Sequence, residues 1–346
     1  MKSANINMKL ILVLIMISSS VFFASCQELK RKAYTLDATV VDQDGKPVVD
    51  AIIVGSSDKI VSRNPIPQAE YEREQAKTDI QGNAHITLMR YSEWPSGVLV
   101  EKDGYYNTKK TVTWPQMTDG KNCSHAISSI QIKKIKNPVG MYACSNSGSA
   151  EKIAKIKQFN TKCGFDLQYA EALPPLGRGK YADFYFTLEG NYESNSEYNM
   201  TLKIEFPNKL DGIVEFDTAG RINSRETNIQ GSFMQSNYEA PESGYKQTVV
   251  KKSWNSKVDT IPQNDNDMKK NYYFRVRTKT DAQGRIVSAN YGKIYGDFFL
   301  DPANFDWGYY ATLMLVDTYF NPTNNDRNVE FDLKKNLLQN SDVKYP

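Results

Sequence analysis

The residues most often used in nucleophilic and acid–base catalysis are few in this chain, which has two histidines and four cysteines among 346 residues. His85 lies in an alternating segment, residues 84–88, whose apolar members would face a core, so we expect its side chain on the surface. His125 closely follows Cys123, but a Cys–His nucleophile pair needs a third group that orients the base. The sequence indicates no such group, and we predict no catalytic residue.

Carboxylates offer a second kind of chemistry, because two Asp or Glu residues across a cleft can hydrolyse glycosidic bonds. The 40 acidic residues give no basis for choosing a pair. The run from Asn264 to Asp267 lacks the glycine and the distant glutamate of a calcium loop, so a solvated loop is expected there. Zinc-ligand spacing and a phosphate-binding glycine loop are also missing, so we expect no metal and no cofactor.

Aromatic residues are the one suggestive excess, at 21 Tyr, 15 Phe and 4 Trp. They cluster at Tyr272–Phe274 and again at Phe305, Trp307 and Tyr309–Tyr310. Exposed rings can stack on sugars, whereas rings within β-sheets fill cores and form cross-strand pairs. The core role is favoured, and no ligand-binding residue is assigned.

Residues 1–25 have the form of an export signal. Lysines precede an apolar stretch, Leu10–Ala24, which matches the apolar part of a signal peptide and is short for a membrane span. Ala24 and Ser25 then lead into Cys26, a pattern that resembles the lipobox of bacterial lipoproteins. The resemblance implies cleavage before Cys26, lipidation of its thiol and stable anchoring by several acyl chains.

Two alternatives to a lipid anchor stay open, namely an ordinary signal peptide that is cut nearby and an uncleaved anchor. Met8 is a second plausible start, and Gln27 follows the cysteine where an aspartate would favour retention in the inner membrane. We therefore expect the outer membrane, on either of its faces. Loss of residues 1–25 removes two lysines and no acidic residue, which lowers the net charge from +3 to +1. Such a balance gives no reason to expect a nucleic-acid partner.

Three cysteines remain beyond Cys26, and an exported compartment favours disulfides. Three thiols allow one bridge in three pairings. We prefer Cys144 with Cys163, because both lie in one polar connecting stretch, and closing that loop would contribute about 3 kcal/mol in the chain-entropy model. The alternative is that Cys123, Cys144 and Cys163 are all buried thiols.

Residues 34–134 have the pattern of a β domain. β-branched residues alternate over Thr35–Val41, and Asp42–Gly45 has the Asp and Gly positions of a type I turn with a glycine at positive φ. The same turn chemistry recurs at Thr78–Gly82, and Glu101–Tyr105 ends a further strand in a turn.

These segments, in this order and spacing, resemble the carboxypeptidase regulatory-like domain, with Ala38–Val48 and Ala51 as further carriers. The resemblance implies a seven-stranded, prealbumin-like β-sandwich that has no catalytic residues. A long insertion at residues 55–77 departs from the family pattern.

Residues 137–346 predict a larger β-rich, sandwich-like domain. Asp281–Gly284 joins two alternating segments in a hairpin, and polar stretches elsewhere indicate loops. The one helix candidate is Ser149–Phe159, whose alternation fits a strand nearly as well. This half resembles a pattern that recurs in uncharacterised exported bacterial proteins and implies no known activity. Its carriers are Lys136–Ala143, Gly164–Leu167, Gly177–Lys180 with Asp183, Thr318–Pro322 and Asn325–Asp332.

The expected organisation is a signal peptide at 1–25, a tether at 26–33, the sandwich at 34–134 and a β domain of unknown function at 137–346. The leading hypothesis is a non-enzymatic binding or scaffold protein of the cell envelope with a glycan or protein ligand. The alternatives are an envelope glycoside hydrolase that uses carboxylates of the second domain, and a structural component of an outer-membrane complex.

Overall fold

The computed structural model describes residues 31–346 apart from 63–67, 92–95, 118–122, 146–152, 219–229, 259–260, 268, 304–306, 340 and 342. The described part contains 25 strands and no α-helix, so the all-β prediction is confirmed. None of its elements is a helix long and apolar enough to span a membrane.

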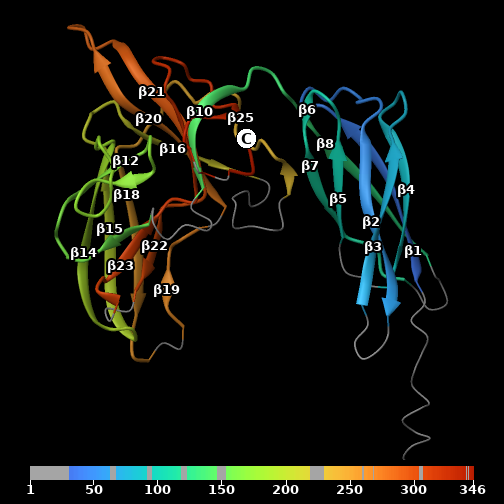
Figure 1. Cartoon of the computed structure of the whole chain (residues 1–346), viewed down its shortest axis with the longest axis horizontal. Helices are drawn as coiled ribbons and strands as arrows, with labels where there is room; N and C mark the ends of the chain where they lie inside the picture. The colour runs from blue at the N-terminus through green and yellow to red at the C-terminus, as the bar shows by residue number, and fades with distance from the viewer. Residues whose placement is uncertain are drawn as a thin grey trace, which may run out of the picture.

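Seven strands of the N-terminal β region (residues 32–134) form two sheets (Figure 1). The first has the order β4-β1-β8, with β1 antiparallel to β4 and parallel to β8. The second has the order β7-β5-β2-β3, with antiparallel neighbours throughout. The bounds are β1 Lys32–Val41, β2 Ile52–Ser62, β3 Gln68–Lys77, β4 Asn83–Arg90, β5 Ser96–Glu101, β7 Thr108–Val112 and β8 Cys123–Gln131, and a short pair joins β6 Tyr105–Tyr106 to β9 Lys133–Lys134.

Alternating side chains build the core of this sandwich. On β1 the residues Tyr34, Leu36, Ala38 and Val40 are buried, and they share one hydrophobic cluster with residues of β2, β4, β5, β7 and β8. The turn after β1 forms as its residue types require, since Asp42 Oδ1 accepts hydrogen bonds from the backbone N–H groups of residues 44 and 46.

The C-terminal β region (residues 139–346) contains two six-stranded sheets and one three-stranded sheet. Their orders are β16-β20-β21-β24-β10-β25, β13-β12-β14-β15-β18-β19 and β11-β23-β22. The bounds are β10 Val139–Ser145, β11 Ala154–Ile156, β12 Cys163–Asp166, β13 Glu171–Ala172, β14 Phe184–Ser194, β15 Glu197–Glu205, β16 Gly212–Asp217, β18 Thr248–Asn255, β19 Gln263–Asn264, β20 Lys270–Thr280, β21 Ile286–Tyr295, β22 Phe299–Pro302, β23 Ala311–Met314, β24 Asp317–Asn321 and β25 Phe331–Asn336.

The main core of the C-terminal β region lies between the sheets and is rich in rings, including Phe165, Phe184, Phe206 and Phe298. The Asp281–Gly284 hairpin joins β20 to β21 as predicted. Within the 149–159 helix candidate, residues 154–156 form strand β11 and none of the other described residues is helical, so the strand alternative is supported there.

Polar contacts join the two β regions where they meet, near the top of the view in Figure 1. Strand β17 (Gly231–Ser232) adds to the edge of β7, although its residues come from the C-terminal half. The buried carboxylate of Glu330 accepts hydrogen bonds from Tyr106 OH at 2.8 Å and from the backbone N–H groups of Lys136 and Asn137 at 2.8 and 2.7 Å. The result is an arch in which both β regions extend from this junction in the same direction (Figure 1).

Candidate functional site

One cavity with a convergent polar lining lies in the C-terminal β region and has a volume of about 560 Å³. We call it the Arg277 cavity. The turn at 207–211, strands β20 and β21, the 181–182 segment and Asn324 line it; the residues are Tyr181, Ala182, Pro207, Asn208, Asp211, Arg277, Thr278, Lys279, Ser288, Asn290 and Asn324.

A β-bulge directs Arg277 toward this cavity. The pairing of β20 with β21 shifts register between Val276 and Lys279, and Arg277 has a φ of 58°, in the left-handed region. The backbone groups freed by the bulge find side-chain partners, because Thr278 N donates to Asp211 Oδ1 at 3.1 Å and Asn208 Nδ2 donates to Thr278 O at 2.5 Å. Backbone strain of this kind in a non-glycine residue tends to occur at functional sites.

Two buried carboxylates hold the guanidinium of Arg277. Its Nε donates to Asp183 Oδ1 at 2.8 Å, and a terminal nitrogen donates to Asp183 Oδ2 and Asp166 Oδ1, each at 3.1 Å. The other terminal nitrogen donates to Gln168 Oε1 at 2.7 Å. The aspartate side chains are 0–1% exposed and that of Arg277 is 22% exposed, so the ion pair fixes a cation at the cavity wall.

The same carboxylates organise the chain around the cavity. Asp166 Oδ2 accepts hydrogen bonds from the backbone N–H groups of Lys180 and Tyr181 at 2.8 and 3.0 Å, and Asp183 Oδ2 accepts one from Leu167 N at 2.9 Å. The Tyr181 ring is then 4.8 Å from the Arg277 guanidinium and 53% of the residue is exposed. Tyr181 therefore lines the cavity as an exposed ring with the Arg277 guanidinium over one of its faces.

Burial shifts the protonation of the acids at this site. It raises the pKa of Asp183 to about 6, although the neighbouring Arg277 favours the charged form. Burial also raises the pKa of Asp211, against the hydrogen bond that the backbone N–H of Thr278 donates to it. The pKa of Arg277 lies above its ordinary value, because the pairing with Asp183 outweighs the effect of burial, so the guanidinium stays charged.

Sequence reasoning found some of these residues and missed others. Asp166 and Asp183 belong to the recurrent pattern noted in the sequence, but their shared partner Arg277 was not singled out. The separations of 111 and 94 residues leave no local signal of the contact. Asn208 and Asp211 were also missed.

The predicted lipid attachment at Cys26 lies outside the described residues. The predicted Cys144–Cys163 bridge is not present in the structure, where both side chains are thiols. Cys144 is buried on β10 and Cys163 is half-buried on β12, and these strands belong to different sheets. Cys123 is an exposed thiol. The alternative prediction, that all three cysteines are buried thiols, is therefore correct only for Cys144.

Both histidines lie on the outer face of the β4-β1-β8 sheet, as predicted for His85. Asp37 Oδ1 is 2.7 Å from Nδ1 of His85, and Asp37 Oδ2 is 3.2 Å from Nε2 of His125. The sequence did not predict that both histidines contact Asp37, because these contacts depend on the register of three strands. All three side chains are about half exposed. Across the described part of the chain, no group of three or more His, Cys, Asp or Glu residues could hold a metal ion.

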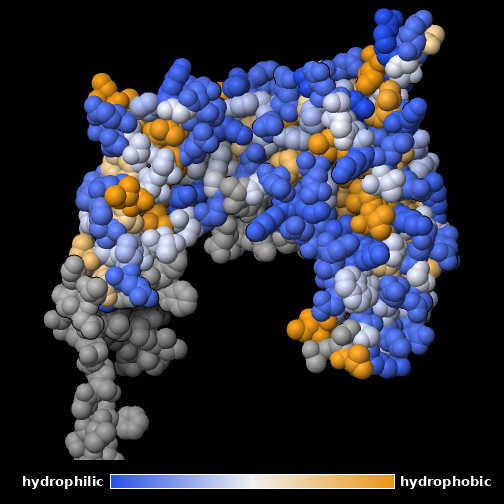
Figure 2. Space-filling model, turned by 180° about the vertical axis from the view of Figure 1, so that it is seen from behind, coloured by the Kyte–Doolittle hydropathy of each residue, from blue (hydrophilic) through white to orange (hydrophobic). Residues whose placement is uncertain are grey.

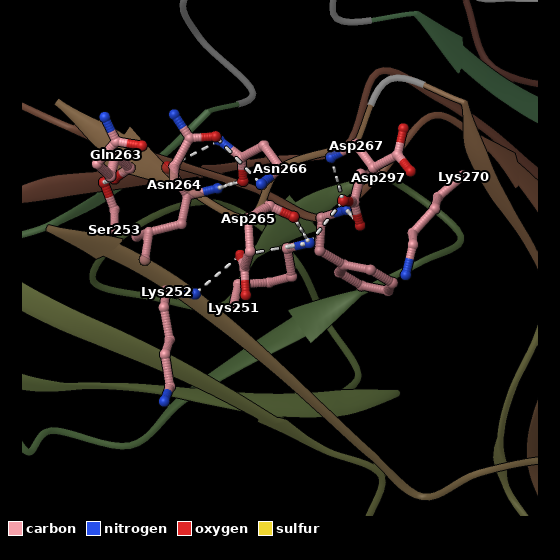
Figure 3. A network of polar contacts seen from close by, with 12 residues as sticks. Lys251, Lys252, Ser253, Gln263, Asn264, Asp265, Asn266, Asp267, Lys270 and Asp297 are labelled. Atoms are coloured by element: carbon pink, nitrogen blue, oxygen red, sulfur yellow. Dashed lines mark hydrogen bonds and ion pairs between the residues drawn. The ribbon is translucent and has the colours of Figure 1, made fainter. Parts of the chain in front are cut away.

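The run from Asn264 to Asp267 forms a polar network instead of an ion-binding loop (Figure 3). The buried carboxylate of Asp297 accepts hydrogen bonds from Lys251 Nζ at 2.6 Å and from Asp267 N at 2.8 Å. Lys251 also donates to Asp265 O at 2.7 Å. The network attaches the segment after β19 to the core, while Asn264 and Asp265 stay exposed as expected for a solvated loop.

The two aromatic clusters differ in exposure. Tyr272–Phe274 are buried, in agreement with a role in the core. Trp307 is 68% exposed, while Phe305 lies outside the described residues.

Comparison with known proteins identifies no family. No protein-family model matches the chain, and no curated protein matches it. Among solved structures, a 3-chlorocatechol 1,2-dioxygenase from Rhodococcus opacus is similar over 32% of this chain and 62% of its own, at 13% identity and a TM-score of 0.23. The chain thus spans less than two thirds of that enzyme.

Two Bacteroides structures are similar over 85% of this chain. One is a candidate membrane-associated protein of unknown function from Bacteroides fragilis. The similarity covers 99% of that protein's chain, at 12% identity and a TM-score of 0.18. The other is a candidate carbohydrate-binding protein from Bacteroides uniformis. The similarity covers 98% of that protein's chain, at 10% identity and a TM-score of 0.16. All three TM-scores are too low to support an argument about fold or function.

Proposed function

We propose that this protein is a lipid-anchored component of the bacterial cell envelope that binds a glycan in the Arg277 cavity. The observation that carries the proposal is the combination at one cavity of an exposed aromatic ring, Tyr181, with the exposed side-chain amide of Asn324.

This combination suits a sugar. The apolar face of a sugar ring packs against an aromatic ring, while its hydroxyl groups need donors and acceptors at fixed positions. Tyr181 supplies the ring, and Asn324 supplies an exposed amide in the same lining. Arg277 is already paired with two carboxylates, so a neutral sugar suits the site better than an anion that would have to compete with them.

Binding fits the lining better than hydrolysis does. Hydrolysis by a carboxylate pair places two acids on either side of the scissile bond. Asp211 is the one carboxylate among the described lining residues, and its side chain already accepts a hydrogen bond from the backbone of Thr278. Asp166 and Asp183 lie behind Arg277 and are engaged by it.

The binding test uses the protein from Gln27 onward, which keeps every described residue. Neutral oligosaccharides, such as glucans, mannans, xylans and chitin fragments, are titrated by calorimetry. We expect one class to bind and Tyr181→Ala to weaken that binding about fivefold or more, since a stacked ring is worth about 1 kcal/mol or more. Tyr71→Ala is the matched control, because Tyr71 is 74% exposed on the distant strand β3. Equal losses in both variants, or no binding of any oligosaccharide, would contradict the proposal.

The anchor is tested separately in cells. Cys26→Ala should abolish labelling with a fatty-acid analogue and release the protein from the membrane fraction. We expect this because several acyl chains anchor a protein stably, and none of the described residues forms a helix that could span the membrane. Membrane retention that is unchanged by the substitution would rule out the anchor.

A further inference from the structure

Large apolar side chains are exposed at the free end of the C-terminal β region. Val258 is 88% exposed, Ile261 is 67% exposed and Trp307 is 68% exposed. Val258 and Ile261 lie in the segment between β18 and β19, and Trp307 lies between β22 and β23. We call these three residues the apolar tip.

Contacts between neighbouring segments place the apolar tip at one end of the region. Asn255 Nδ2 donates to Asn195 O at 3.0 Å, which joins the end of β18 to the β14–β15 hairpin. The same hairpin contacts the 307–310 segment, because the rings of Tyr192 and Tyr310 are 5.6 Å apart. Figure 2 shows hydrophobic residues at the lower end of this part of the molecule, away from the junction.

The chain leaves the N-terminal β region in the same direction. Strand β1 begins at Lys32, at the end of the sandwich opposite the junction, and Figure 1 shows this end and the free end of the C-terminal β region both pointing downward. Cys26 is six residues before Lys32, and six residues span about 20 Å at most. An anchor at Cys26 would therefore hold the bilayer close to both ends of the arch.

We propose that the apolar tip is a second membrane contact, which docks onto the lipid bilayer that the N-terminal anchor occupies. The inference rests on the proposed lipid anchor for its orientation. A tryptophan at the headgroup level and aliphatic side chains below it are the residue types that proteins place in a membrane interface. The contact needs little affinity of its own, because the anchor supplies a high effective concentration of bilayer. Its consequence is an arch fixed at two points, with the junction held away from the bilayer.

The test measures binding of the protein from Gln27 onward, which keeps every described residue and lacks both the signal segment and the anchor cysteine. The probe is vesicles of phosphatidylethanolamine and phosphatidylglycerol at 3:1, in flotation and in titration of tryptophan fluorescence. We expect weak, saturable binding with a blue shift, and a loss of about tenfold or more in the Val258→Asp/Ile261→Asp variant, because each aliphatic side chain gives up its burial.

Ile80→Asp is the control, since Ile80 is 74% exposed in the turn between β3 and β4, at the junction end of the sandwich. It should bind vesicles as the unmodified protein does. The proposal is overturned if the unmodified protein does not bind at millimolar lipid, or if the tip and control variants bind equally. It is also overturned if the tip variant loses self-association in sedimentation while its vesicle binding is unchanged. Failure of the anchor is seen independently, in the membrane fractionation of Cys26→Ala.

Discussion

Arg277→Gln should destabilise the C-terminal β region by an amount that depends on pH. The substitution removes the cation between Asp166 and Asp183, whose side chains are 0–1% exposed. Removing one partner of a buried ion pair typically costs about 3–5 kcal/mol, because the remaining charge has lost its solvent and its partner. The glutamine amide can replace at most part of the hydrogen bonding. We therefore expect the free energy of unfolding at pH 8 to fall by an amount that approaches this range.

The sign of the pH dependence follows from the pKa of Asp183. Burial raises this pKa to about 6, above the ~3.9 of an unfolded aspartate. The folded protein therefore binds the Asp183 proton more tightly than the unfolded protein does. Protonation of Asp183 raises the free energy of unfolding as the pH falls from about 6 toward 4, and it contributes nothing at pH 7 and above. Without Arg277 the pKa of Asp183 rises further, so the variant recovers stability at a higher pH than the unmodified protein does.

Urea unfolding followed by circular dichroism, at pH 5, 6, 7 and 8, measures the difference between the two proteins. We expect the difference to be largest at pH 8 and to shrink toward pH 5. Arg285→Gln is the control, because Arg285 pairs with Asp281 at 2.7 Å but its side chain is 77% exposed, and such pairs are worth about 0–1 kcal/mol. A loss that is the same at every pH, or no larger than that of the control, would refute the idea that Arg277 neutralises two buried carboxylates.

Two further predictions concern the junction and the thiols. Tyr106→Phe removes a hydrogen bond to the buried carboxylate of Glu330, so calorimetry should find a loss of about 1.5–3 kcal/mol in the unfolding of the full chain, and a melting curve identical to that of the unmodified protein would contradict the contact. Labelling with a maleimide should modify Cys123 first, since it is exposed, and Cys163 more slowly, because burial raises the pKa of its thiol. Cys144 should react only in urea, and rapid labelling of it in the folded protein would conflict with its burial on β10.

The parts of this fold that the sequence predicted are those that depend on near neighbours. The turn at Asp42–Gly45 forms because one aspartate caps the N–H groups of the residues that follow it, and the alternation over Thr35–Val41 places one face of β1 in the core. The pairing of β17 with β7 joins residues more than 100 positions apart, through two residues with no strand pattern of their own. Tertiary contacts decide such pairings, so no local pattern could have predicted it.

At the Arg277 cavity, residues of the recurrent sequence pattern have a structural role. A Cβ at Gly177 would lie 2.4 Å from Ala172 O, and one at Gly179 would lie 2.7 Å from Glu171 O, so the 177–180 loop can fold against strand β13 only with glycine at both positions. The close approach lets the backbone at Lys180 and Tyr181 reach the carboxylate of Asp166, which also holds Arg277. One buried aspartate thus orients both the ring and the cation of the proposed binding site. Asp166→Asn, which keeps an acceptor oxygen but removes the charge, should therefore weaken glycan binding even though Asp166 is not itself among the lining residues. If a folded Asp166→Asn protein binds the glycan as well as the unmodified protein does, the recurrent pattern has no role in ligand recognition.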